Sequence, residues 1–287
     1  VLIPVRIPLI STLFNKYLAK LPVINHLCLT NYINARPVNI QSKESINRFS
    51  TTVLIPARNE SGNIENAILR LPKFGKHIEI IYVEGNSTDD TWQKIQEIQQ
   101  KYKDTHDIKI AQQDGKGKGD AVRKGYAMAT GDILMILDAD LTVPPEDLPK
   151  FYRAIASGKA EFINGSRLVY PMEKNAMRFL NHLGNKFFSL VFSWMLEQPI
   201  KDTLCGTKVM FRKDYIRLSE NRSYFGEFDP FGDYDLLFGA YKLNLKIIDL
   251  PVRYQERVYG DTNISRFSHG FLLLRMCLFA ARKIKFW

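Results

Sequence analysis

Cysteine is scarce in this chain of 287 residues: Cys28, Cys205 and Cys277 are the three, and they lie far apart. An odd number of widely spaced cysteines excludes a disulfide framework, and the close pairs of a zinc site are missing. The class of small disulfide-dependent secreted domains is therefore excluded, and a reducing compartment is the simplest expectation.

Long hydrophobic runs are also missing, and so are the features of a signal peptide. The best apolar stretches, FFSLVFSWML at 187–196 and FLLLRMCLFA at 271–280, are shorter than the roughly 20 residues of a spanning helix. A buried helix is an equally good interpretation of 187–196. A basic start, an apolar core and a cleavage site are not found together at either end. Because the chain opens on Val1 rather than Met, we expect it to be part of a longer protein.

Net charge is lacking in the middle of the chain, although the whole carries +10. Residues 1–50 hold six Lys/Arg and one acid, residues 250–287 hold seven and two, and residues 51–249 hold 27 of each sign. Both basic ends are rich in Leu, Ile, Phe and Tyr. This combination is typical of segments that lie on anionic lipid. Nucleic acid would explain the charge but not the apolar residues, so we expect a membrane surface and no nucleic-acid partner.

From residue 50 onward, strand and helix patterns alternate. The predicted strands are 50–57, 78–85, 108–113 and 132–140, and the predicted helices are 59–72, 87–102 and 117–129. Alternation with short connections indicates an α/β fold, a mostly parallel sheet flanked by helices. We predict three parts: a membrane-interface or docking segment at 1–49, a catalytic domain at 50–264 and an amphipathic helix at 265–287.

Polar, glycine-bearing or acidic segments follow each predicted strand: PARNE, EGNSTDD, DGKGKGD and DAD. Ligands of such sheets bind outside the carboxyl ends of the strands, so these segments predict one site. In an extended chain Asp138 and Asp140 point to the same side, where two carboxylates repel each other. A divalent cation removes that conflict, and Mg²⁺ commonly binds one or two carboxylates together with substrate phosphates. The alternative is that these aspartates only cap a turn or a helix.

Taken together, these motifs resemble glycosyltransferases of family 2, which have the GT-A fold. The matching stretches are VLIPARNE, VEGNSTDDT, GKGDAVRKGYAMATGDILMILDAD, DTLCGTKVMFRKD and GDYDLL, in the family's order within 50–264. Within the family the chain is most similar to polyprenyl-phosphate sugar synthases of the dolichyl-phosphate mannose synthase type. The stretch RYQERVYGDTNISRFSHGFLLLRM also resembles bacterial members that follow a methyltransferase domain.

The resemblance implies a role for each matching residue. The implied metal ligands are Asp138 and Asp140, with Mg²⁺ or Mn²⁺ as the cofactor. The implied substrate-binding residues are Pro56, Ala57, Arg58, Asn59, Glu60, Glu84, Lys118, Asp120, Asp138, Ala139, Asp140, Arg257 and Arg266. Glu84 stands where the family usually has Asp, and Gly85 where a second Asp is common, which leaves the base of the nucleotide open.

Two residues match catalytic positions, Arg167 and Asp233, the latter with Asp235 close by. For Arg167 the alternative is a surface ion pair, and for Asp233 it is the cap of the helix that follows. An alcohol acceptor needs a general base, which Asp233 would supply, whereas a phosphate acceptor is already ionised and scarcely needs one.

The function implied by the resemblance is inverting, metal-dependent transfer of a sugar from a GDP- or UDP-linked donor to a polyprenyl phosphate. The enzyme would sit peripherally on the cytoplasmic face of the membrane. Transfer to an alcohol on a glycan or lipid stays open. A nucleotidyltransferase also stays open, although PARNESGN is a poor triphosphate loop. A catalytically inactive nucleotide-binding protein is a further alternative, against which the intact acids argue.

Overall fold

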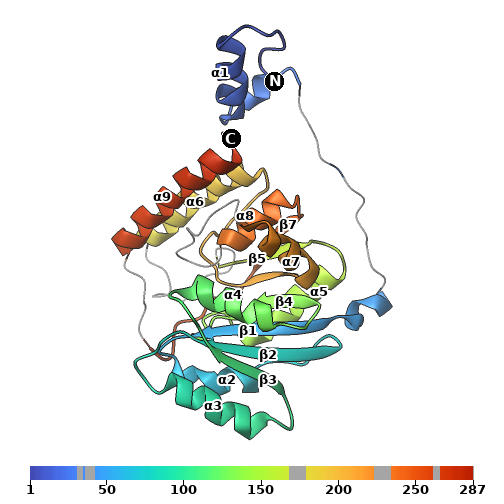
Figure 1. Ribbon diagram of the computed structural model, residues 1–287, viewed down its shortest axis with the longest axis vertical. Helices are drawn as coiled ribbons and strands as arrows, with labels where there is room; N and C mark the ends of the chain where they lie inside the picture. Colours follow the sequence, from blue (N-terminus) through green and yellow to red (C-terminus); the bar gives the residue numbers. More distant parts are fainter. Residues whose placement is uncertain (31–34, 36–42, 168–178, 223–233, 261–265, 287) are drawn as a thin grey trace.

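The computed structural model describes residues 1–30, 35, 43–167, 179–222, 234–260 and 266–286 (Figure 1). In these residues one sheet of seven strands has the order β3-β2-β1-β4-β6-β5-β7. The strands are β1 (Ser50–Ala57), β2 (His77–Glu84), β3 (Asp107–Gln112), β4 (Ile133–Ile136), β5 (Phe162–Ser166), β6 (Lys208–Phe211) and β7 (Ile247–Pro251). All neighbouring pairs are parallel except those of β6, which runs antiparallel to β4 and to β5. The predicted mostly parallel sheet is confirmed.

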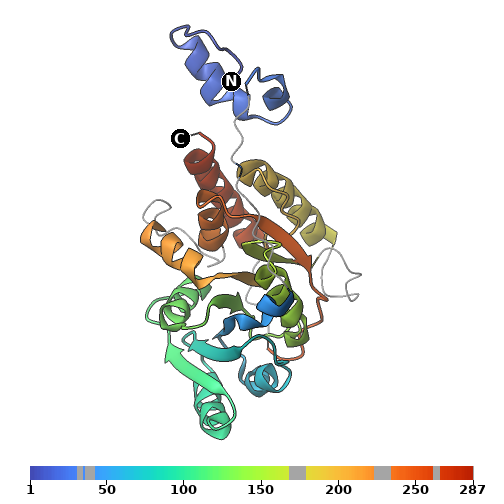
Figure 2. The same cartoon turned by 90° about the vertical axis from the view of Figure 1, so that its right-hand side faces the viewer.

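Helices cover both faces of the sheet (Figure 2). Those within the described residues are α1 (Ile10–Lys16), α2 (Ile64–Leu69), α3 (Thr91–Tyr102), α4 (Lys118–Met128), α5 (Leu148–Ala156), α6 (Phe179–Leu196), α7 (Arg212–Glu220), α8 (Tyr234–Lys242) and α9 (Arg266–Ile284). One face packs against α2, α3 and α5, and the other against α4, α6, α8 and α9. No helix among these is long and apolar enough to cross a membrane.

Successive residues of the central strands enter opposite halves of the core. Val53 of β1 belongs to the half of the core that includes α2, α3 and α5, whereas Leu54 belongs to the half that includes α4, α6 and α9. A strand buried on both faces appears in the sequence as an unbroken apolar run. This is why the runs VLI and ILMI predict interior strands correctly. Gly125 lets α4 approach β1 closely, because a Cβ atom there would overlap the side chain of Leu54.

The predicted strand at 132–140 is wrong at its carboxyl end. β4 ends at Ile136, and a turn follows in which the N–H of Leu141 donates to the carbonyl of Asp138 at 3.1 Å. Leu141 adopts a φ of 53°, which closes this turn. Asp138 and Asp140 therefore lie in a turn, so the extended geometry that we predicted to place them on one side is wrong.

Two predicted helices begin later than expected. The helix predicted at 87–102 starts at Thr91, because Asp89 Oδ1 accepts hydrogen bonds from the N–H and hydroxyl of Thr91 and holds a turn before the helix. The helix predicted at 59–72 is a short 3₁₀ turn, Ser61–Asn63, followed by α2. The connections that follow the carboxyl ends of β1 and β2 are therefore longer than predicted.

The N-terminal segment packs against the ends of α6 and α9 (Figure 1). The carbonyl of Lys20 accepts a hydrogen bond from Trp194 Nε1 at 2.7 Å, and Tyr17 stacks on Phe286 with 5.8 Å between ring centroids. The ammonium of Lys20 donates to the carbonyl of Lys285. Burial and the nearby Lys285 lower the pKa of Lys20. The two basic ends of the sequence thus meet at one pole of the molecule.

Candidate active site

The segments after β1, β2 and β4 meet at one edge of the sheet, because these strands are parallel neighbours. The glycine-bearing segment between β3 and α4 ends at the same edge. The convergence that the sequence predicts is therefore present in the fold. The positions of the individual side chains decide what this edge can bind.

Asp138 pairs with the first residue of α4. Its Oδ1 lies 2.6 Å from Nζ of Lys118, and the two side chains are 29% and 27% exposed. A Cβ atom on Gly206 would overlap both Asp138 Oδ2 and Lys118 Nζ. Glycine in the DTLCGT segment thus lets the backbone lie against the acid. The structure brings together the predicted Asp138 and Lys118, and it adds Gly206.

Asp140 is held from two sides. Its Oδ1 accepts hydrogen bonds from the N–H (3.1 Å) and the hydroxyl (2.9 Å) of Thr142, and its Oδ2 accepts one from Arg257 Nη2 at 2.7 Å. Arg257 Nη1 donates to Glu60 at 2.5 Å, and Glu60 also accepts a hydrogen bond from Asn63 Nδ2 at 2.8 Å. Burial raises the pKa of Glu60, and the charge of Arg257 partly opposes that rise. One guanidinium therefore joins the segments that follow β1, β4 and β7.

The segment after β1 is tied to the segment after β2. Asn59 adopts a φ of 56°, and its N–H donates to Ser87 Oγ at 3.0 Å. The N–H of Thr88 donates to Asn59 Oδ1 at 2.8 Å. Arg58, between β1 and this link, is exposed. Asn59 therefore shapes the loop, and Arg58 presents its side chain at the edge of the sheet.

Glu84 and Asp120 accept hydrogen bonds from residues at and after the carboxyl ends of β2 and β3. Glu84 is buried, and it accepts the N–H of Ser87 at 2.5 Å and Nε2 of Gln112 at 3.1 Å. Asp120 Oδ2 accepts the N–H of Gly115 at 2.7 Å. Both carboxylates brace the loops at the carboxyl ends of β2 and β3, beside the site predicted for the nucleotide.

The remaining predicted residues fall in several places. Pro56 and Ala57 end β1, and Ala139 is buried between the two acids. Asp233 and the side chain of Arg266, the first residue of α9, lie outside the part of the chain that the structure describes.

Asp235, the neighbour of Asp233 in the sequence, pairs with Arg222 at 3.0 Å. Burial raises the pKa of Asp235, and the charge of Arg222 opposes that rise.

Arg167 forms a buried ion pair with Asp202, a residue that the sequence analysis missed. The guanidinium donates from Nε to Oδ2 at 2.7 Å and from Nη2 to Oδ1 at 2.8 Å. Asp202 also accepts hydrogen bonds from Asn185 Nδ2 and from the N–H of Leu204. Burial by itself would raise the pKa of Asp202, but the charge and hydrogen bonds of Arg167 outweigh it and hold that pKa well below its ordinary value. The expected alternative of a surface ion pair is wrong, because the pair is buried.

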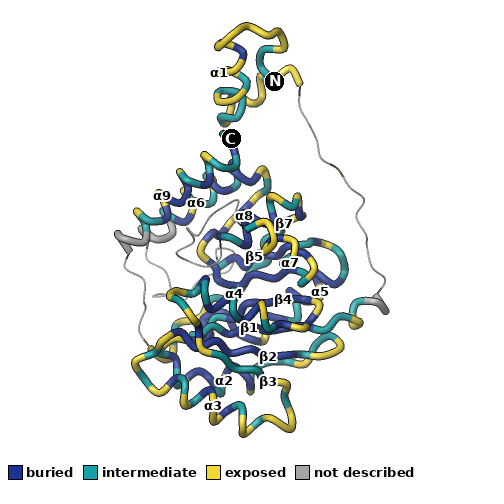
Figure 3. Tube along the Cα trace, in the orientation of Figure 1, coloured by how far each residue is buried: buried dark blue, intermediate teal, exposed yellow. Residues whose placement is uncertain are grey.

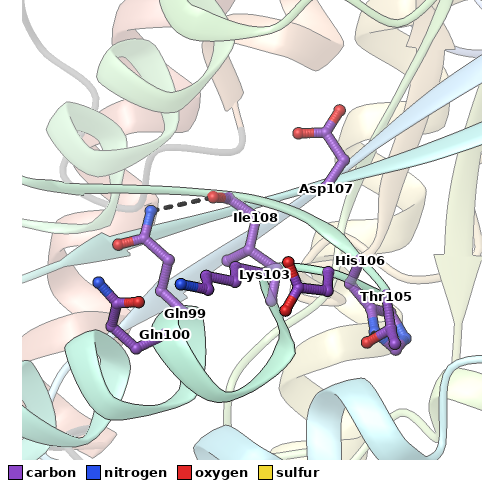
Figure 4. A pocket seen from close by; sticks show the side chains of 8 residues that line it. Gln99, Gln100, Lys103, Thr105, His106, Asp107 and Ile108 are labelled. Atoms are coloured by element: carbon purple, nitrogen blue, oxygen red, sulfur yellow. Dashed lines mark hydrogen bonds between the residues drawn. The ribbon is translucent and has the colours of Figure 1, made fainter.

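A hollow of about 670 Å³ lies at a different edge (Figure 4). Its lining comes from the end of α3 and the start of β3, including Gln99, Lys103 and Asp107. The amino end of a parallel strand faces away from the edge where Asp138 and Asp140 lie. This hollow is therefore separate from the candidate site.

The donor atoms at the site suit a hard divalent cation. Within the described residues no group of three or more His, Cys, Asp or Glu could hold a metal ion by itself. One or two carboxylates, here Asp138 and Asp140, are the protein contribution that Mg²⁺ typically receives when substrate phosphates and water complete its coordination. The site therefore fits an ion that binds together with a diphosphate.

Comparison with known proteins identifies the family. Residues 52–218 match the family described as Glycosyl transferase family 2. The dolichol-phosphate mannosyltransferase of Pyrococcus furiosus is 30% identical over 222 residues, which cover 74% of this chain and 58% of that protein. The dolichyl-phosphate beta-glucosyltransferase of Saccharomyces cerevisiae is 27% identical over 246 residues, covering 76% and 70%.

A likeness in structure extends over most of the chain. The glucosyl-3-phosphoglycerate synthase of Mycobacterium tuberculosis, solved with Mn²⁺, UDP and glucosyl-3-phosphoglycerate, superposes with a TM-score of 0.58 at 15% identity, covering 88% of this chain and 86% of that one. This likeness shows the GT-A fold. The low-salt glycan biosynthesis hexosyltransferase Agl6 of Haloferax volcanii is 27% identical over 231 residues, which cover 79% of this chain and 52% of that protein. The chain thus spans only 58% of the Pyrococcus furiosus mannosyltransferase and 52% of Agl6. By the match over residues 52–218, which is more than half of its length, the chain belongs to glycosyl transferase family 2.

Proposed function

We propose that the chain transfers a sugar, with inversion, from a GDP- or UDP-linked donor to a polyprenyl phosphate or another membrane-associated acceptor. The observation that carries the proposal is the presence of two ion pairs, Asp138 with Lys118 and Asp140 with Arg257, after the carboxyl end of β4 in a family 2 sheet. The names of the two dolichol-phosphate sugar transferases among its relatives support the lipid acceptor.

Asp138 and Asp140 are the proposed ligands of Mg²⁺ or Mn²⁺. When bound, the ion would act as a Lewis acid for the leaving diphosphate. The Mn²⁺ in the structure of the mycobacterial synthase supports this assignment.

The basic side chains at the site have a separate role. During transfer the bond between the anomeric carbon and the diphosphate oxygen breaks, and negative charge builds up on the diphosphate. Lys118 and Arg257 carry positive charge at the proposed metal ligands, so they would stabilise the charge that develops on the diphosphate. An acceptor phosphate attacks as an anion and needs no base.

An exposed apolar surface supports the membrane location. Phe187 and Leu190 of α6 are 52% and 72% exposed, and Phe271, Leu274 and Leu278 of α9 are 71%, 41% and 66% exposed (Figure 3). The two helices lie side by side in both views (Figures 1 and 2). We call these five side chains the α6/α9 apolar face.

Exposed basic residues lie on the same two helices as the α6/α9 apolar face. Lys186, Arg275 and Arg282 are exposed on the same helices. The N-terminal segment adds further exposed apolar side chains at this pole, among them Leu9, Val23 and Leu29. Apolar side chains bordered by Lys and Arg suit a surface of anionic lipid. We propose that the protein lies peripherally on the inner face of the membrane through this pole. In this proposal α6 contacts the lipid together with the predicted segments 1–49 and 265–287.

Transfer assays test the proposed function. The purified protein is given radiolabelled GDP- and UDP-sugars with Mn²⁺ and a short-chain polyprenyl phosphate, and thermal shift reports donor binding. We expect one donor class to stabilise the protein only with Mn²⁺ and to yield a lipid-linked sugar. Asp140→Asn should abolish the product and the Mn²⁺-dependent shift while remaining folded.

Other outcomes would contradict the proposal. Donor binding without turnover on any acceptor would indicate the inactive nucleotide-binding protein. Nucleotide-sugar formation from a sugar phosphate and a nucleoside triphosphate would indicate the nucleotidyltransferase. A product formed only with an alcohol acceptor would overturn the lipid phosphate while keeping the glycosyltransferase.

A further inference from the structure

Each of the two site acids already faces a cationic side chain. Lys118 approaches Asp138 from the start of α4, at 2.6 Å. Arg257 approaches Asp140 from the segment after β7, at 2.7 Å. The protein thus neutralises with its own residues the pair of carboxylates to which the proposed function assigns a divalent ion.

Arg257 is placed by an arrangement that reaches beyond Asp140. Its second terminal nitrogen donates to Glu60, whose side chain is only 7% exposed. Two residues after Arg257, the hydroxyl of Tyr259 lies 2.9 Å from Ser61 Oγ, next to Glu60 in the sequence. A Cβ atom on Gly62 would overlap the ring of Tyr259, so that ring lies directly on the loop after β1. The segment 257–260 is therefore fastened over this loop, with the guanidinium pointing at Asp140.

Both oxygens of Asp140 have partners in this arrangement. Oδ1 accepts two hydrogen bonds from Thr142, and Oδ2 accepts one from Arg257. Mg²⁺ binds carboxylate oxygens at about 2.0–2.1 Å. A divalent ion at that distance from Oδ2 would lie close to the guanidinium, and the two positive charges would repel each other strongly in this partly buried place. The ion and Arg257 therefore compete for the same oxygen.

We propose that Arg257 is an exchangeable counter-cation of Asp140: it neutralises the acid in the metal-free enzyme, yields to the divalent ion, and then binds the diphosphate of the donor. This inference rests on the proposed function, because it takes Asp140 as a metal ligand. A guanidinium that leaves one carboxylate finds a matching partner in a phosphate, to which it can donate two parallel hydrogen bonds.

The exchange couples two binding events. A metal ion that binds alone must displace Arg257 from Asp140, and no phosphate is then present to replace Asp140 as a partner of the guanidinium. A metal ion that binds with the donor displaces Arg257 toward the diphosphate. Metal and nucleotide should therefore favour each other's binding, and by linkage the coupling is reciprocal. The metal-free site is protected from binding a divalent ion without a donor.

The test measures binding, not catalysis, in the full chain. Mn²⁺ affinity is determined by electron paramagnetic resonance of free Mn²⁺ without nucleotide, and the affinities of UDP and GDP are determined at saturating Mn²⁺. For Arg257→Gln we expect Mn²⁺ alone to bind about tenfold more tightly or better, and the preferred nucleotide to bind about tenfold more weakly. Loss of structure lowers both affinities, so the opposite signs identify the exchange.

The matched control is Arg253→Gln, an exposed arginine of the same segment. It removes the same charge but should change both affinities by less than about threefold, the size expected from a screened surface charge. If Arg257→Gln fails to fold, Arg257→Lys keeps the charge but cannot donate to Glu60 and Asp140 in the same way. It should give a smaller gain in Mn²⁺ affinity of the same sign.

Three results would overturn the exchange, and they separate it from the proposed function. If wild type binds Mn²⁺ with a nucleotide but Arg257→Gln shows no gain for Mn²⁺ alone, the exchange is wrong and the metal site stands. If Arg253→Gln gives the same gain, the effect is one of net charge and the exchange is wrong. If no variant binds Mn²⁺ with or without UDP or GDP, the metal site and the exchange both fail.

Discussion

Arg167 and Asp202 face each other through two parallel hydrogen bonds in the interior, where the arginine side chain is 12% exposed and the aspartate fully buried. The same geometry occurs on the surface between Arg70 and Glu146, where the side chains are 36% and 50% exposed. The protein thus contains a buried and an exposed version of one interaction.

We predict that Asp202→Asn lowers the free energy of unfolding by about 3–5 kcal/mol, because it leaves the buried Arg167 charge without its partner. Glu146→Gln is the matched control and should cost less than about 1 kcal/mol, as exposed ion pairs do. Urea unfolding of both variants measures the difference. Equal losses in the two variants would contradict the structural role of the buried pair.

The sequence could not predict this pair. Asp202 lies in DTLCGT, which carries the family resemblance, but its partner Arg167 precedes it by 35 residues. Pairing between segments so far apart depends on tertiary packing, which no local pattern records. The same holds for Arg257, which was predicted near phosphate but not at Asp140.

Glu79 predicts a pH dependence of stability. Burial by itself would raise the pKa of Glu79, but hydrogen bonds from Lys109, Thr52 and Thr130 outweigh it and lower that pKa to about 2 from an ordinary 4.5. A lowered pKa contributes stability that is complete above pH 4.5 and is lost as the pH falls toward 2. The contribution amounts to at most about 3 kcal/mol.

The comparison of wild type with Glu79→Gln isolates this contribution. The difference in unfolding free energy between them, by urea titration, should be largest near pH 6. It should shrink as the pH falls from 4.5 toward 2. A constant difference across that range would show that the charge of Glu79 is irrelevant to stability.

The α6/α9 apolar face predicts how the protein binds vesicles. Leu278→Glu should weaken binding to vesicles containing phosphatidylglycerol by roughly tenfold or more, since burying one Leu side chain contributes about 1.5–3 kcal/mol. Leu69→Glu on α2, where the leucine is 62% exposed, should have little effect. Co-sedimentation at low and high salt measures both, and salt should weaken but not abolish the binding of wild type. Equal binding by Leu278→Glu and wild type would refute this orientation.

Asp233 decides between the acceptors, although it lies outside the described residues. With a polyprenyl phosphate as acceptor, Asp233→Asn should reduce kcat only modestly, because the nucleophile is already charged. With an alcohol acceptor the loss should reach the roughly 10²–10⁴-fold of general-base catalysis. Steady-state transfer to a short-chain polyprenyl phosphate measures it. A thousandfold fall in kcat with unchanged donor affinity would show that the acceptor assignment or the role of Asp233 is wrong.

The fold was predictable where the pattern is local. The apolar run of β1 predicted Ser50–Ala57 to the residue, and alternation with helices predicted a mostly parallel sheet. The stretch 187–196 could not be assigned to the interior or the surface, since α6 buries Phe192 on one side and exposes Leu190 on the other. β5, β6 and β7 were all missed, and the antiparallel β6 shows why: KVMF is four residues long and its partners are distant in the sequence.

The position of β6 has a consequence for biosynthesis. β4 ends at Ile136, but the strand that covers its free edge begins only at Lys208, and β5 is made in between. As the chain leaves the ribosome, β1 to β4 can assemble while one edge of β4 stays unpaired. If β5 paired with that edge, it would occupy the position that β6 takes in the finished sheet. Unpaired edges are the common starting point of aggregation. Slowing translation after β5 should therefore lower the soluble yield, whereas slowing it after β6 should not.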